Sequence, residues 1–191
     1  MTMDIADRHD AEITRELIAR MARDIAGMTA ALESQAGHEA LESASRVHAE
    51  ENTDFLRNLI AQCGWPTARR FGEYAQAAAG WLLAFSARVD PVFQRRCLLL
   101  LAQLLDAGEV EGDFYGFTVD RVLVSQGRRQ RYGTQVHGNR PRLRSDEVED
   151  PLRLNARRAQ IGLEPLEIDQ PRRSRRPQQS PNRKRRGTSR P

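Results

Sequence analysis

Two polar stretches are candidates for chemistry because they interrupt apolar helical patterns. Asp120 and Arg121 fall inside the apolar segment 114–127, and Tyr132, Gly133, Thr134 and Gln135 follow it. A carboxylate, a guanidinium, hydroxyls and an amide can line a cleft and hold a polar ligand through bidentate and amide hydrogen bonds. The same residues can also form an ion pair that fastens the second stretch to the helix, with Gly133 permitting a bulge. The sequence leaves both interpretations open.

Other site signatures are absent from the sequence. None of the four histidines follows a glutamate at the Glu-x-x-His spacing of a helical metal site, and His-Glu-x-x-His does not occur. The stretch 108–117 contains glycines but lacks the spacing and the lysine of a phosphate-binding loop, and no Gly-x-Ser-x-Gly is present. We therefore expect no metal and no cofactor. Cys63 and Cys97 share no metal-ligand spacing, so we expect reduced, buried thiols.

The elements that must position the candidate residues are mainly helices. Apolar residues recur at intervals of four and three over 11–32, which predicts one helix, and a second apolar stripe predicts another over 38–63 that ends at Gly64, Trp65 and Pro66. These two helices should pack antiparallel. The segment 73–87 is apolar on most faces, which indicates a helix buried in the middle of the domain, with Trp81 and Phe85 on one face.

Three further helices are predicted from capping signals. Asp90 and Pro91 begin a helix that Gly108 ends. Asp113 can cap a helix that ends at Gly127, with Phe114, Phe117, Val122 and Val124 facing inward. Asp150 and Pro151 repeat the cap signal before a helix to about residue 161. Between these last two, 129–150 consists of two short extended pieces separated by Gly, Asn and Pro, which reads as an irregular β-hairpin.

The sequence thus predicts a mainly α, helical-bundle-like domain of about six helices with a small β-hairpin over residues 1–169, followed by a tail over 170–191. The tail has no aliphatic residue and should be disordered. The apolar runs of the whole chain are too short to span a membrane, and the first ten residues lack the features of a secretory signal. We therefore expect a cytoplasmic protein. The oligomeric state stays open.

The tail is also the most basic part of the chain. Residues 171–191 hold nine basic residues and no acidic one, which leaves 21 basic against 26 acidic residues in the remainder. Two clusters of cations are candidates for contact with nucleic acid or another polyanion through counterion release: Arg172, Arg173, Arg175, Arg176, Arg183, Lys184, Arg185 and Arg186. A passive solubilising tail, or one resting against the acidic first sixty residues, is the alternative.

An ordered series of short motifs resembles a known family. The series runs from "GWP" and "DPVFQRRCL" through "DRV" and "YGTQ" to "DPLRLNARRAQIGLEPL", and it covers about 24–166. It is similar to the bacterial family catalogued as domain of unknown function 6624, which implies a fold but no assigned activity. Members carry Gln-His-Ala-Asp after the tryptophan helix, where this chain has Phe85, Ser86, Ala87 and Arg88. The loss of the histidine and the acid would impair any acid–base chemistry there.

Two functional hypotheses follow. The first is a non-catalytic binding or interaction module, a degenerate family member, that takes a small polar ligand. Its pocket candidates are Trp81, Ser86, Asp120, Arg121, Tyr132, Gly133, Thr134 and Gln135. The second is an enzyme of unknown reaction that uses the same pocket, with His48 or His137 in place of the missing histidine.

Overall fold

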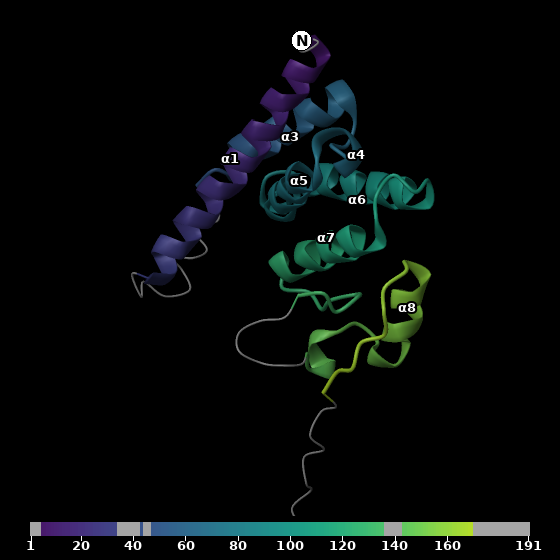
Figure 1. The fold of residues 1–191 in the computed structure, drawn as a ribbon. Coiled ribbons are helices and arrows are strands. Elements are labelled where there is room, and N and C mark those ends of the chain that lie inside the picture. The colour runs from purple at the N-terminus through teal and green to yellow at the C-terminus, as the bar shows by residue number, and fades with distance from the viewer. Residues whose placement is uncertain (1–4, 34–42, 44–46, 136–142, 170–191) are drawn as a thin grey trace, which may run out of the picture.

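The computed structural model describes residues 5–33, 43, 47–135 and 143–169, and in these residues the chain forms seven α-helices and no strand (Figure 1). The helices are α1 (Ile5–Glu33), α3 (Ala49–Cys63), α4 (Ala68–Phe71), α5 (Glu73–Phe85), α6 (Pro91–Asp106), α7 (Gly112–Ser125) and α8 (Leu154–Gln160). Three short 3₁₀ helices accompany them: η1 (Ser86–Arg88), η2 (Ser145–Glu147) and η3 (Pro151–Arg153). The predicted mainly helical class is confirmed. The predicted tail over 170–191, with all of its candidate cations, lies outside the described residues.

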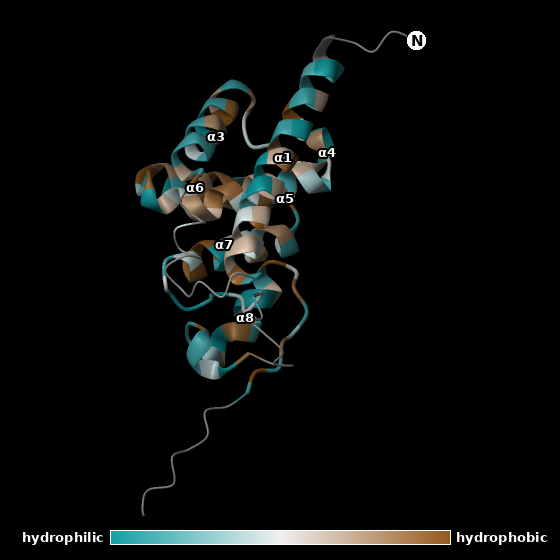
Figure 2. Cartoon of the chain, turned by 90° about the vertical axis from the view of Figure 1, so that its left-hand side faces the viewer, coloured by the Kyte–Doolittle hydropathy of each residue, from teal (hydrophilic) through white to brown (hydrophobic). Residues whose placement is uncertain are grey.

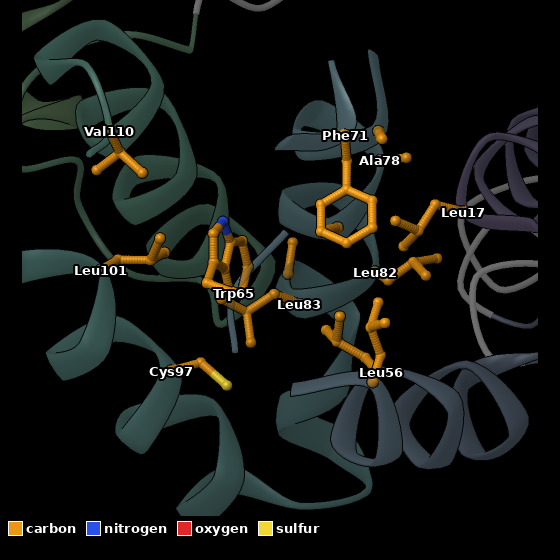
Figure 3. Packing of buried hydrophobic residues seen from close by; sticks show 14 of the residues in the cluster. Leu17, Leu56, Trp65, Phe71, Ala78, Leu82, Leu83, Cys97, Leu101 and Val110 are labelled. Carbon is orange, nitrogen blue, oxygen red and sulfur yellow. The ribbon is translucent and has the colours of Figure 1, made fainter. Parts of the chain in front are cut away.

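Helix α5 occupies the centre of the fold and contacts α1, α3, α4, α6 and α7. Its small side chains allow this, because Ala75, Ala78 and Ala79 have no exposed surface and let neighbouring helices approach closely. In Figure 3, side chains from α1, α3 and α4 point toward Leu82, and those from α6 point toward Trp65 and Leu83. The expectation of a helix buried in the middle of the domain is therefore correct.

Gly80 sets the distance between α5 and α7. A Cβ atom at this position would lie 3.0 Å from the Thr118 hydroxyl oxygen and 3.2 Å from the Phe114 ring. Both neighbours belong to α7, so the absence of a side chain at position 80 lets the two helices pack together. Helix α8 lies beyond α7, on the side of α7 that faces away from α1 and α5 (Figure 1).

Local signals set several helix ends. The Asp90 side chain accepts a hydrogen bond from the Phe93 N–H at 2.8 Å, and Pro91 is the first residue of α6, as predicted. Of the two other predicted caps, Asp113 is wrong, whereas Asp150 does precede the helical segment that begins at Pro151. Glu111 precedes α7 and Asp113 lies inside its first turn, while Asp150 makes no capping hydrogen bond and is followed by the 3₁₀ turn η3.

Helices α1 and α3 run antiparallel, as predicted. Arg20 of α1 lies over the Phe55 ring of α3, and Asp24, one turn later on α1, contacts Asn52, one turn earlier on α3. The second helix begins at Ala49, later than predicted, because Val47 and His48 form a turn. The rest of its predicted span (residue 43 apart) lies outside the described residues. Figure 2 shows alternating hydrophilic and hydrophobic residues along these helices, as expected when only one face of a helix is covered.

The predicted β-hairpin is not supported. In the described residues on its two sides, Gln130 and Val148 form an isolated parallel bridge, whereas a hairpin requires antiparallel pairing. The second piece contains the helical turn η2 instead of a strand. The physical reason lies in α7, because the Asp120 carboxylate takes the backbone N–H groups of Arg131, Tyr132 and Thr134, which a partner strand would otherwise need.

Candidate functional site

Asp120 is completely buried and holds the segment after α7 in place. Its Oδ1 accepts hydrogen bonds from the N–H groups of Arg131 at 2.6 Å and Tyr132 at 3.0 Å. Its Oδ2 accepts from the N–H and the hydroxyl of Thr134 at 2.8 and 2.9 Å. These four donors and the carboxylate are named the Asp120 clasp. Charge-assisted hydrogen bonds offset the cost of burying a carboxylate, so the clasp favours the fastening interpretation, with backbone amides in place of an ion pair.

The rest of the "YGTQ" stretch completes this attachment. Tyr132 is buried against the edge of Tyr115, with ring centroids 6.1 Å apart, and its carbonyl accepts a hydrogen bond from Arg158. Gly133 has a φ of +69°, and a Cβ there would lie 3.0 Å from Leu166. These residues are therefore brought together with Asp120, as predicted, but their contacts are directed at the protein itself.

Gln135 also attaches the segment after α7 to that helix. Its side chain donates to the Phe117 carbonyl of α7 at 3.2 Å, and its backbone N–H donates to the Gln130 side chain at 2.8 Å. Both glutamines are buried, so their amides replace the hydrogen bonds that a paired strand would supply.

Arg121 points away from the clasp because consecutive helical residues are about 100° apart around the axis. Its guanidinium carbon lies 4.4 Å above the Trp81 ring of α5 and 5.1 Å from the Phe117 ring. Its Nε is fully covered and has no hydrogen-bond partner in the described residues, and no carboxylate there pairs with the guanidinium. Burial lowers the pKa of Arg121. Phe117 was predicted to face inward, but 44% of its surface is exposed. Its ring lies beside the Arg121 guanidinium.

Trp81 also contacts a carboxylate that sequence reasoning missed. Asp24 of α1 is 8% exposed, and its Oδ2 accepts a hydrogen bond from the Asn52 amide of α3 at 3.0 Å. The Trp81 indole N–H approaches the Asp24 carboxyl and lowers its pKa, yet this buried nitrogen does not reach hydrogen-bond geometry with any described acceptor. Burial has the larger, opposite effect, so the pKa of Asp24 lies above its ordinary value. Asp24, Asn52, Trp81, Phe117 and Arg121 are named the Trp81 cluster.

A signal for the missed residues was present in the sequence. Asp24 falls on the same helical stripe as Leu17 and Met28, and Asn52 falls on that of Leu56 and Leu59. A polar residue on the covered stripe of a helix needs a polar partner, and this requirement points to a site.

The remaining predicted positions have no direct contact with Arg121 in the described residues. Ser86 is fully buried, and its hydroxyl donates to the Leu83 carbonyl at 2.8 Å at the end of α5. His48 lies near Asp24 and favours the ionised carboxylate there, whereas His137 lies outside the described residues. Both Asp120 oxygens already carry two donors, which leaves this carboxylate poorly suited to abstract a proton. The enzyme hypothesis stays a prediction.

The described surface also has hollows. A groove of about 460 Å³ lies beside the Asp10–Arg70 ion pair, whose groups satisfy each other. A cleft of about 410 Å³ adjoins the Trp81 cluster, since Phe117 is part of its wall. The other residues of this cleft are Ala68, Glu73, Gln76, Glu111, Asp113 and Phe114. In the described residues no group of three or more His, Cys, Asp or Glu side chains could hold a metal ion, and no helix is both long and apolar enough to cross a membrane.

Comparison with known proteins gives one match. A model for a family of unknown function (DUF6624) matches residues 12–171, which covers the Asp120 clasp and the Trp81 cluster. No curated protein and no solved structure matches the chain.

Proposed function

Because the chain belongs to this family of unknown function, its role must be inferred from the site, and we propose that it is a binding module for a small ligand with an anionic group. Arg121, stacked on Trp81 and Phe117, would hold that group. The observation that carries the proposal is the Arg121 side chain, whose Nε is covered without a hydrogen-bond partner and whose guanidinium has ring contacts but no carboxylate partner among the described residues.

Other arginines in the same chain show what is unusual about Arg121. Arg20, Arg57 and Arg70 also lie over aromatic rings, and each of them has a carboxylate partner as well: Glu16 and Glu51, Asp54 and Asp90, and Asp10, respectively. Arg131 lies 6.0 Å from the Tyr132 ring and also has no carboxylate partner in the described residues, but it is exposed to water, whereas the Nε of Arg121 is covered. Arg121 has the ring contacts without the carboxylate.

The energetic balance supports a missing partner. An uncompensated buried charge costs several kcal/mol, whereas a cation–π contact returns roughly 0.5–2 kcal/mol. A purely structural role at this position would be met as well by methionine or leucine. The planar guanidinium instead matches carboxylate and phosphate oxyanions through paired N–H groups. The adjoining cleft beside Phe117 offers room for the remainder of such a ligand.

The proposal is tested by the thermal stability of the full chain in acetate, inorganic phosphate and sulfate, with chloride at matched ionic strength as reference. An anion that binds the native state raises its apparent stability by about 2.7 kcal/mol at one hundred times its Kd. We expect stabilisation by at least one oxyanion, and its loss in Arg121→Met. Arg95→Met is the matched control, because Arg95 is an exposed arginine on α6. An Arg121→Met variant that responds as the wild type does, or a wild type that responds to none of the three anions, would refute the proposal.

A further inference from the structure

Asp24 is held in one orientation by a chain of side chains. Arg20 forms ion pairs with Glu16 at 2.7 Å and Glu51 at 3.1 Å, and it also donates to the Asn52 Oδ1 at 3.0 Å. With its oxygen bound to Arg20, the Asn52 amide must direct its Nδ2 toward Asp24, as observed at 3.0 Å. The carboxylate is thus positioned by a supporting layer of hydrogen bonds, as functional groups in protein sites are.

The Asp24 carboxylate is also poorly compensated. Asn52 provides its only hydrogen bond in the described residues, and the Trp81 N–H stops short of one. The other groups that favour the ionised form act through space, namely His48, which precedes α3, and Arg23 from α1 itself. Burial outweighs all of them, so the pKa of Asp24 stays above its ordinary value.

Asp24 and Arg121 have opposite charges and contact the same indole. Helix α5 contacts both α1 and α7, and its Trp81 meets the Asp24 carboxyl at the indole nitrogen and the Arg121 guanidinium at the ring face. The two charges form no ion pair with each other in the described residues. Asp24 is buried with one hydrogen bond, and Arg121 is partly buried with a covered Nε that has no hydrogen-bond partner. A ligand that carries both complementary charges would satisfy both residues at once.

We infer that the ligand of the Trp81 cluster is a small zwitterion, whose anionic group binds Arg121 and whose protonated amine binds Asp24. This inference rests on the proposed anion site and specifies its ligand class. Asn52 is then a positioning residue for Asp24.

The inference is tested with two ligand series of matched length. The first is the ω-amino acids glycine, 4-aminobutyrate and 6-aminohexanoate, and the second is acetate, butyrate and hexanoate, which lack the amine. At pH 7 the amines are protonated. Binding is followed by calorimetry and by the fluorescence of Trp81 in a Trp65→Phe background. We expect one amino acid to bind about tenfold tighter than its carboxylate, the size of one favourable charge contact. Asp24→Asn should remove this increment.

The acidic cleft beside Phe117 holds competing carboxylates, and a variant there tests whether the amine binds them instead. Glu111→Gln removes one of its carboxylates without touching Asp24, and it should keep the full increment. Loss of the increment in Glu111→Gln, or its survival in Asp24→Asn, would overturn the assignment to Asp24. If carboxylates bind through Arg121 but no amino acid binds more tightly, the zwitterion inference fails and the anion site stands. If neither series binds, the proposed function fails and this inference fails with it.

Discussion

Replacing Asp120 by asparagine should destabilise the protein without changing the shape of the side chain. In the wild type, four donors converge on the two carboxylate oxygens. The asparagine oxygen can keep the N–H groups of Arg131 and Tyr132, but its NH₂ group then faces the N–H of Thr134. The Thr134 hydroxyl can rotate and accept from that group, so one buried N–H loses its partner.

The expected loss can be worked out from these contacts. An unsatisfied buried donor costs about 1–3 kcal/mol, and exchanging a charged for a neutral acceptor costs roughly 1 kcal/mol per bond for the two that remain. Allowing for relaxation, we expect Asp120→Asn to lower the free energy of unfolding by about 3 kcal/mol. Asp120→Ala leaves all four donors without an acceptor and should cost more. Thr134→Val removes one hydroxyl from the clasp and should cost about 1 kcal/mol.

Urea unfolding followed by circular dichroism and by tryptophan fluorescence measures these differences. Both probes are needed, because Trp65 and Trp81 lie outside the segment that the clasp holds. A loss below about 1 kcal/mol for Asp120→Asn, equal to that of Thr134→Val, would contradict the reasoning, since one unsatisfied buried donor alone should exceed it.

Three further results are expected. Gly133→Ala should destabilise by more than Gly127→Ala in urea unfolding, because both glycines have a φ of +69° but only Gly133 has neighbours within 4 Å of the added Cβ; equal losses would contradict this. Iodoacetamide should label native Cys97 far more slowly than Cys63 at pH 8, because burial raises the pKa of Cys97 to about 12 while Cys63 is partly exposed; mass spectrometry of the labelled peptides decides. The pKa of Asp24 in the folded state lies above the ordinary 3.8, so the native state binds this proton more tightly than the unfolded state does. Stability should therefore fall as the pH rises through the folded pKa. Asp24→Asn should flatten that fall in thermal unfolding, and an unchanged pH profile would refute this expectation.

The fold was predictable wherever the signal was local. The Asp90 cap and the proline after it are adjacent in sequence, and the small residues of α5 show by themselves that this helix is surrounded. The hairpin was mispredicted because the decisive contact is not local. The residues after Gly127 look extended, but their backbone donors are taken by Asp120, eleven to fourteen residues earlier in the chain.

The candidate site was predictable only in part for the same reason. Asp120 and Arg121 are neighbours in sequence and were considered as one unit, yet the helix directs them to different surroundings. The partners of Arg121 come from α5 and α7 itself, and the opposite charge comes from α1, nearly a hundred residues away. The spacing of residues along the chain does not reveal which side chains from three different helices will contact one another.

The absence of a side chain at Gly80 sets how closely the α5 and α7 residues of the Trp81 cluster approach each other. Trp81 is the next residue on α5, and α7 reaches it only because nothing protrudes from position 80 toward Thr118 and Phe114. A methyl group at position 80 would push α7 away from α5 and so move the Arg121 guanidinium away from the Trp81 ring. The residues of the Trp81 cluster themselves would be unchanged. Gly80→Ala should therefore weaken anion binding although position 80 is not part of the cluster. Such a loss would show that binding depends on the distance between α5 and α7 as well as on the side chains present.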